Sequence, residues 1–217
     1  MPRHLERDLD RLSKELLTMG AMVEDATNKA FLAFTQRRKD VAREVVEGDH
    51  VINEKENKIE EECLKILALH QPVATDLRFI ITALKVNNDL ERMGDLAVNI
   101  ADRAADLAER DPMPVPKPLA SVLTKVQGMV RDSLNSLVDM DSQLARRVCD
   151  VDDEVDDINR RMYTDMQEVI KENPASVEQA ISMLSVSRHL ERVADLATNI
   201  AEDVVFLVEG EIVRHNL

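Results

Sequence analysis

One thirteen-residue segment occurs twice in this chain, 100 residues apart. Residues 90–102 read LERMGDLAVNIAD and residues 190–202 read LERVADLATNIAE, so that nine of thirteen positions are identical. The apolar residues of both copies follow the spacing of an amphipathic helix. Shared helical periodicity does not by itself place Glu, Arg, Asp and Asn at the same positions. The match therefore indicates that one helical unit has been duplicated within the chain.

A proline-rich stretch separates the two copies. Four of the seven prolines lie in residues 111–118, which read DPMPVPKP. Proline at every second position excludes a helix and favours an extended polyproline II conformation. We therefore expect a short, stiff linker at 111–118 between a first repeat, residues 1–110, and a second repeat, residues 119–217.

Each half contains three long segments with helical periodicity. Only 2% of the residues are aromatic and five are glycine, which is typical of long helices rather than strands. Apolar residues at heptad spacing run from Leu5 to Ala30 in the first half and from Leu119 to Met140 in the second. Short connections between long helices favour antiparallel neighbours. The sequence predicts an all-α fold of two tandem, pseudo-symmetric three-helix bundles with six long helices.

Two proline positions suggest where the third helix of each half begins. Pro72 is expected as the first residue of one helix, with Asp76 favouring its N-terminus. Asn173 followed by Pro174 is a good N-cap and first-position proline for the other.

The repeated segments carry a polar stripe beside their apolar face. The stripe positions fall within an arc of roughly 80° on a helix, and they are Glu91, Asp95, Asn99 and Asp102 in the first copy and Glu191, Asp195, Asn199 and Glu202 in the second. Aligned acids repel each other, and a hard cation bound by carboxylate and amide oxygens would compensate. Salt bridges to Arg92, Arg192 or Arg103 are the alternative. The double occurrence favours metal.

The second helix of each half adds further candidate metal donors next to its apolar seam. They are Asp49, Asn53 and Glu56 in the first half and Asp152 and Asp156 in the second. Packed against the third helices, these side chains would complete an oxygen-rich site between helices. A solvated acidic face explains them equally well.

Motifs for catalysis are missing from the sequence. Helical-bundle di-iron enzymes use Glu-x-x-His, but Gly94 and Ala194 stand three residues after the two motif glutamates. The sequence contains neither a glycine-rich phosphate loop nor a nucleophile elbow. We expect a protein that is not an enzyme. A metal-dependent bundle enzyme, either a dimetal hydrolase or an oxidase, and a metal-free coiled-coil partner protein stay open as alternatives.

Net charge, hydropathy and cysteine pattern limit the binding partners and the cellular compartment that we expect. The formal net charge is −14, which argues against binding to nucleic-acid phosphates or to anionic lipid. No window approaches 18 uncharged apolar residues, so we expect no membrane insertion. Cys63 and Cys149 are far apart and outside any CxxC pattern, as expected for reduced thiols in a cytoplasmic protein.

The repeated segment resembles the signature of a known family. Glu91 to Asp95 and Glu191 to Asp195, in their matching contexts, are similar to the E/D-x-x-x-D motif of the PhoU family of phosphate-transport regulators. The stretches QPVATDLR at 71–78 and VEG at 208–210 also resemble family segments. The resemblance covers essentially the whole chain. Many members carry His after the motif Asp, where this chain has Leu96 and Leu196.

This resemblance implies a fold, a cofactor and partners. It implies two three-helix bundles with multinuclear metal clusters, iron being the first expectation, on Glu91, Asp95 and Asn99 and on their second copies. It also implies a cytoplasmic homodimer that contacts the inner membrane only through its partners. Those partners are the ATPase subunit of the phosphate ABC transporter and a sensor histidine kinase. The implied role is a negative regulator of phosphate uptake and of transcription of the phosphate-starvation regulon.

Overall fold

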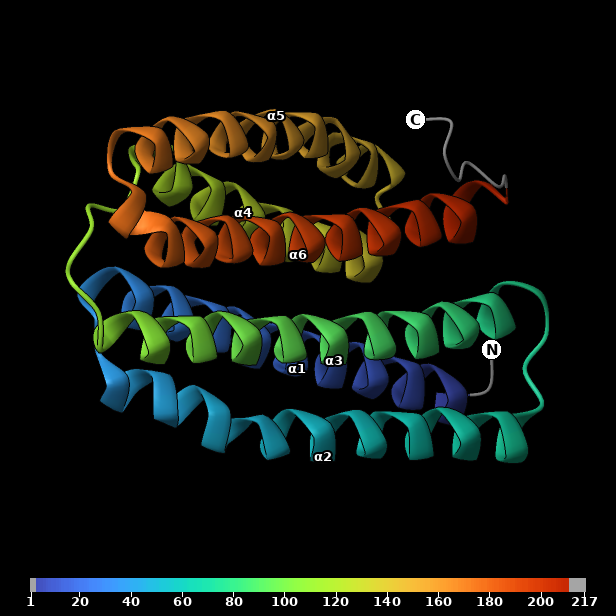
Figure 1. Ribbon diagram of the computed structural model, residues 1–217. Coiled ribbons are helices and arrows are strands. Elements are labelled where there is room, and N and C mark those ends of the chain that lie inside the picture. The colour runs from blue at the N-terminus through green and yellow to red at the C-terminus, as the bar shows by residue number, and fades with distance from the viewer. Residues whose placement is uncertain (1–2, 211–217) are drawn as a thin grey trace.

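The computed structural model describes residues 3–210, and every regular element in that range is helical (Figure 1). The six long helices and one short 3₁₀ turn are α1 (Arg3–Gln36), α2 (Lys39–His70), α3 (Ala74–Ala108), α4 (Lys117–Asp139), α5 (Ser142–Glu172), η1 (Pro174–Ser176) and α6 (Val177–Glu209). The predicted all-α fold with six long helices is confirmed.

The helices form two bundles that pack against each other. Helices α1, α2 and α3 make the first and α4, α5 and α6 the second, with α2 and α5 on the outer sides (Figure 1). Helices α3 and α6 run antiparallel through the middle of the molecule. An ion pair of 2.8 Å between Lys85 Nζ and Asp203 Oδ1 joins one end of this helix pair, and an Arg110–Glu178 ion pair joins the other. The two duplicated segments therefore cross each other at the centre.

Aliphatic side chains build the core, as the low aromatic content requires. The heptad positions Leu12, Leu16 and Met19 of α1 are completely buried, and Ile80, Leu90 and Ile100 of α3 are buried to the same extent. One continuous cluster of buried apolar residues extends through both bundles. None of the helices in the described part of the chain is long and apolar enough to span a membrane.

The helices of the two bundles match at constant spacings. Arg37 and Met140 follow α1 and α4 with left-handed backbones (φ 56° and 54°), and they are 103 residues apart. Helices α2 and α5 begin at Lys39 and Ser142, which are also 103 residues apart. The third helices match at 100 residues. The second bundle therefore has three residues fewer than the first between the start of its second helix and the duplicated segment.

The start of α3 differs from the sequence prediction. Gln71 adopts a left-handed conformation (φ 46°) and caps the end of α2, and Val73 is the N-cap of α3. Pro72 lies buried between them, so the expectation that it opens α3 was wrong by two residues. Its ring fills the corner where the chain reverses instead of starting a helical turn. Asp76 does lie in the first turn of α3, as predicted.

Two other boundaries also depend on proline. The Asn173 side chain accepts a hydrogen bond of 3.2 Å from the Ala175 amide, as expected of a cap. Pro174 opens η1, however, and α6 begins only at Val177. After α3, the non-helical stretch ends at Pro116, and Pro118 lies in the first turn of α4, where a missing N–H costs nothing.

The glycines inside helices lead to a first prediction. A Cβ at Gly48 or at Gly128 would have no foreign atom within 4 Å, whereas one at Gly20 would come within 2.1 Å of Leu134 Cδ1, a buried side chain of α4. Alanine is favoured over helical glycine by about 1 kcal/mol. We expect Gly48→Ala and Gly128→Ala each to raise the thermal midpoint by about 2–4 °C.

The third variant supplies the contrast. Overpacking typically costs about 1–3 kcal/mol, so Gly20→Ala should lower the midpoint. Differential scanning calorimetry of the three variants would measure these shifts. A stabilised Gly20→Ala variant would contradict the close approach of α1 and α4.

Candidate functional site

The duplicated segments match in their pattern of solvent exposure as well as in sequence. From residue 90 to 101 and from 190 to 201, every matched pair of positions falls in the same class of exposure. Glu91 and Glu191 are half-buried, and Asp95 and Asp195 are exposed. Each segment thus presents the same pair of carboxylates in the same way.

A first acid cluster lies between α2 and α3, and it comprises Asp49, Asn53, Glu56, Glu91 and Asp95. Asn53 Nδ2 donates a hydrogen bond of 3.0 Å to Asp49 Oδ2 along α2. Burial, and then the charges of Asp95, Glu56 and Asp49, raise the pKa of Glu91. Partial desolvation, and then the charge of Asp49, likewise raise the pKa of Asp95, although its side chain stays accessible to solvent. The carboxylates from the two helices therefore repel one another across their contact.

A second acid cluster lies between α5 and α6, and it comprises Asp152, Asp156, Asn159, Glu191 and Asp195. Burial, and then Asp195 and Asp156, raise the pKa of Asp152 to about 6. Burial, Asp195 and Asp156 also raise the pKa of Glu191, against a hydrogen bond from Asn159. The pKa of Asp195 is raised by burial and by Asp156. The carboxylates of this cluster therefore also repel one another.

The two clusters contain the same donor groups in different places. At the 103-residue spacing Asp49 matches Asp152, Asn53 matches Asp156, and Glu56 matches Asn159. The amide stands at the second of these positions in α2 and at the third in α5, and an acid takes the other position. Each cluster therefore has four carboxylates and one amide. Sequence reasoning missed Asn159, because only the 100-residue spacing of the third helices was used.

The carboxylates of the two acid clusters form no salt bridge among the described residues. None of the eight cluster carboxylates lies within 4.0 Å of a described Lys, Arg or His nitrogen. Arg92 instead pairs with Asp89 at 3.7 Å, and Arg103 pairs with Asp106 at 3.6 Å. The negative charge of both clusters is therefore not neutralised by contact within this part of the protein.

Several acceptor atoms of the clusters also lack a partner. Asp49 Oδ1, Asn53 Oδ1 and Asp152 Oδ1 are buried without a hydrogen bond, which costs free energy in a folded protein. Oxygen acceptors short of donors suit a hard cation. Within residues 3–210, however, no three His, Cys, Asp or Glu side chains are already gathered closely enough to hold one metal ion.

The outer stripe residues divide into two groups. Asn99 and Asn199 line a groove of about 400 Å³ between α3 and α6. Its other lining residues are Arg92, Asp95 and Leu96 and their second copies Arg192, Asp195 and Leu196. Glu202 lines a hollow of about 390 Å³ with Asp152, Asp195 and Cys149. Glu202 and Asp152 contribute, after burial, to raising the Cys149 pKa to about 11.

The remaining stripe residue stands apart. Asp102 is exposed and lines neither of these hollows. The structure therefore brings Glu202 to the second cluster and leaves Asp102 outside the first.

Comparison with known proteins places both repeats in one family. The PhoU domain model matches residues 16–104 and again residues 119–204. The phosphate-specific transport system accessory protein PhoU homolog of Aquifex aeolicus is 38% identical over 97% of this chain and 96% of its own length. The homolog 1 of Thermotoga maritima is 34% identical, over 99% of this chain and 93% of its own length.

Solved structures agree with this placement. The crystal structure of PhoU from Pseudomonas aeruginosa superposes with a TM-score of 0.89 at 35% identity, covering 95% of this chain and 99% of that one. The phosphate transport system regulatory protein PhoU from Streptococcus pneumoniae gives a TM-score of 0.90 at 29% identity, with 96% and 98% covered. On the sequence and on the fold alike, this chain belongs to the PhoU family.

Proposed function

We propose that this protein is a non-enzymatic accessory protein of a phosphate-specific transport system. The support is family membership over both repeats, together with relatives that are named as accessory or regulatory proteins of phosphate transport. The match is nearly end to end in both directions. The whole of this chain, rather than one grafted domain, is therefore assigned to that role.

The proposed partners follow the family resemblance. The protein would connect the ATPase subunit of a phosphate ABC transporter to a sensor histidine kinase and keep the starvation regulon off when phosphate is plentiful. We propose that it acts as a homodimer. Its charge of −14 suits partners with basic contact surfaces, because complementary charge speeds association and selects partners.

We further propose that each acid cluster binds metal, with iron as the first candidate. The observation that carries this is the equal donor set: four carboxylates and one amide on each side, without a neutralising cation within 4.0 Å among the described residues. The orphaned oxygens of Asp49 and Asp152 fit such a role. A metal-free coiled coil would not account for two matched donor sets.

The residues would act by binding and positioning. Glu91 and Asp95 on α3 would change rotamer toward Asp49 on α2, since the donors do not yet converge. A bound cation would supply positive charge that holds the two helices together. Glu191, Asp195 and Asp152 would do the same for α6 and α5. The two proposed metal sites would both border the α3–α6 groove, because Asp95 and Asp195 line it.

A genetic measurement tests the regulatory role. Deleting the gene should raise a phosphate-starvation reporter in high-phosphate medium, because the proposed repressor is absent. Re-expression of the wild-type chain should return the reporter to its low level, and an Asp102→Ala chain should do so equally well. A reporter that stays low in the deletion strain would contradict the regulatory proposal, whatever metal the protein binds.

A further inference from the structure

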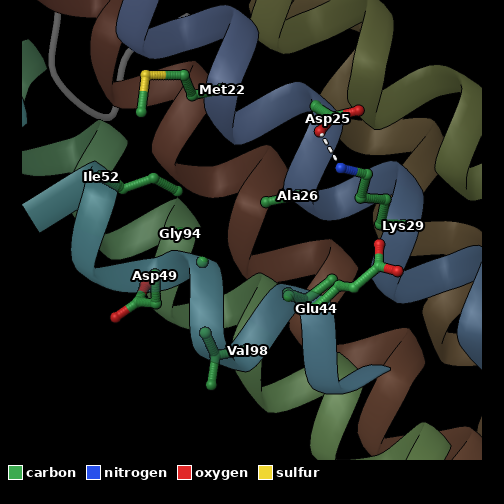
Figure 2. Close-up of a pocket in the computed structure, with 11 residues that line it drawn as sticks. Met22, Asp25, Ala26, Lys29, Glu44, Asp49, Ile52, Gly94 and Val98 are labelled. Atoms are coloured by element: carbon green, nitrogen blue, oxygen red, sulfur yellow. Dashed lines mark ion pairs between the residues drawn. The ribbon is translucent and has the colours of Figure 1, made fainter. Parts of the chain in front are cut away.

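A pocket in the first bundle has no assigned role. It lies between α1, α2 and α3, has a volume of about 170 Å³, and opens to solvent (Figure 2). Its apolar wall is formed by Met22, Ala26, Val45, Ile52 and Val98. Gly94 is its one lining residue within the E-x-x-x-D motif, and Asp49 is shared with the first acid cluster.

Small residues on three different helices open this pocket. They are Ala26 on α1, Gly48 on α2 and Gly94 on α3. At the matched spacings of 103 and 100 residues, the second bundle has Met129, Val151 and Ala194. Met129, a larger side chain at the position that matches Ala26, is 2% exposed. The pocket therefore distinguishes the first bundle from the second in an otherwise symmetric chain.

Gly48 is not required by packing. A Cβ there would meet no foreign atom within 4 Å, although a helical glycine costs stability relative to alanine. Gly94 is different, because its Cβ would come within 3.2 Å of Ile52 Cδ1. The space beside Gly48 is therefore free to accept a group from another molecule.

The charges around the pocket are mostly negative. Lys29 Nζ pairs with Asp25 Oδ2 at 2.8 Å and lies between Asp25 and Glu44 in Figure 2. Glu44 has no ion pair within 4.0 Å of it among the described residues. Asp49 Oδ1 is a buried acceptor without a partner, on the wall beside Gly94. The pocket lining thus contains one lysine, which is already paired with Asp25, and the carboxylates of Glu44 and Asp49.

We propose that this pocket receives a lysine or arginine side chain of a partner protein. An aliphatic stem would cover the apolar wall, and the cationic end group would meet Glu44 and the field of Asp49. Long basic side chains combine these two parts, and a buried basic anchor in a pocket is a common centre of binding energy. An anion would be repelled by these carboxylates, and a purely apolar group would bring no cation to Glu44 and Asp49.

A small probe tests the proposal with the intact protein. n-Butylammonium reproduces a lysine side chain, n-butanol has the same stem without charge, and butyrate has the opposite charge. In titrations followed by NMR of methyl groups, butylammonium should shift signals of Met22, Ala26, Val45 and Val98 with a dissociation constant of about 1–10 mM. Butanol should bind at least about fivefold more weakly, and butyrate should not bind.

Two variants localise the effect. Gly48→Leu fills the pocket and should weaken butylammonium binding at least about tenfold, while Gly128→Leu, the same change at an equally open helical glycine of α4, should leave it unchanged. Glu44→Gln should weaken binding about threefold or more, and Glu47→Gln, on the exposed face of α2, should not. Equal binding of butanol, or unchanged binding by Gly48→Leu, would overturn the proposal. None of these four variants alters a proposed metal donor, and the titrations use chelator-treated protein, so that Asp49, which also belongs to the first acid cluster, carries no metal.

Discussion

Adding the cognate metal to the chelator-treated protein is expected to raise its thermal midpoint by about 8–16 °C for each acid cluster. A ligand at a thousand times its dissociation constant stabilises the native state by about 4 kcal/mol, and about 2–4 °C accompanies each kcal/mol in a chain of this size. The gain should be large here because burial, and then repulsion between the carboxylates, raise the pKa values of Glu91 and Glu191, and a bound cation would relieve that repulsion.

Variants assign that stabilisation to each cluster. Asp95→Ala should remove the contribution of the first cluster and Asp195→Ala that of the second, and the double variant should not respond to metal. Both side chains are exposed, so neither change opens a core. Asp102→Ala is the matched control, because it removes an exposed acid of α3 outside the cluster. A double variant whose midpoint rises as much as that of the wild type would contradict the assignment.

The second large effect is expected in the pH dependence of the stability of the metal-free protein. The pKa of Asp152 rises from 3.8 to about 6 on folding. A carboxyl whose folded pKa is raised contributes stability that is complete below the unfolded pKa and is lost as pH rises through the folded pKa. The chelated protein should therefore lose stability between about pH 4 and pH 7 from this group. Metal should reverse the trend, since it binds the ionised carboxylates.

Replacing Asp152 by asparagine separates the effect of its charge in the metal-free protein from its contribution to metal binding. Asp152→Asn should stabilise the chelated protein at pH 7.5 by about 1–2 kcal/mol, a figure discounted for the partial exposure of the side chain. It should also reduce stabilisation by metal, because one donor of the second cluster has lost its charge. Asp165→Asn, an exposed acid on the same helix, serves as the control. Urea unfolding at several pH values, with and without metal, would measure both effects. A destabilised Asp152→Asn variant in chelator would contradict the described repulsion.

The helices could be predicted because their apolar spacing is a local property. Leu12, Leu16 and Met19 repeat along α1 and are all buried. The start of α3 could not be predicted in this way. It depends on the left-handed conformation of Gln71 and on the burial of Pro72 in the corner, and both are set by the packing of the chain after it has turned.

The residues of the candidate sites also differ in whether the sequence alone could predict them. Glu91 and Asp95 could be predicted because the motif repeats in sequence. Asn159 could not, because its role becomes visible only when α2 and α5 are matched at their own spacing. The helical arc includes Asp102 but does not tell which acids face the neighbouring helix. The pocket of Figure 2 depends on small residues from three helices, so only the assembled bundle reveals it.

The central claim is that the two matched acid clusters hold metal, and metal content measures it most directly. Untagged wild-type protein and the Asp95→Ala/Asp195→Ala variant would be purified in parallel and analysed by plasma mass spectrometry, with circular dichroism to verify that both are folded. We expect at least about two metal ions per wild-type chain, one or more for each cluster, and almost none in the variant. Equal and substoichiometric metal in the two proteins would contradict the claim.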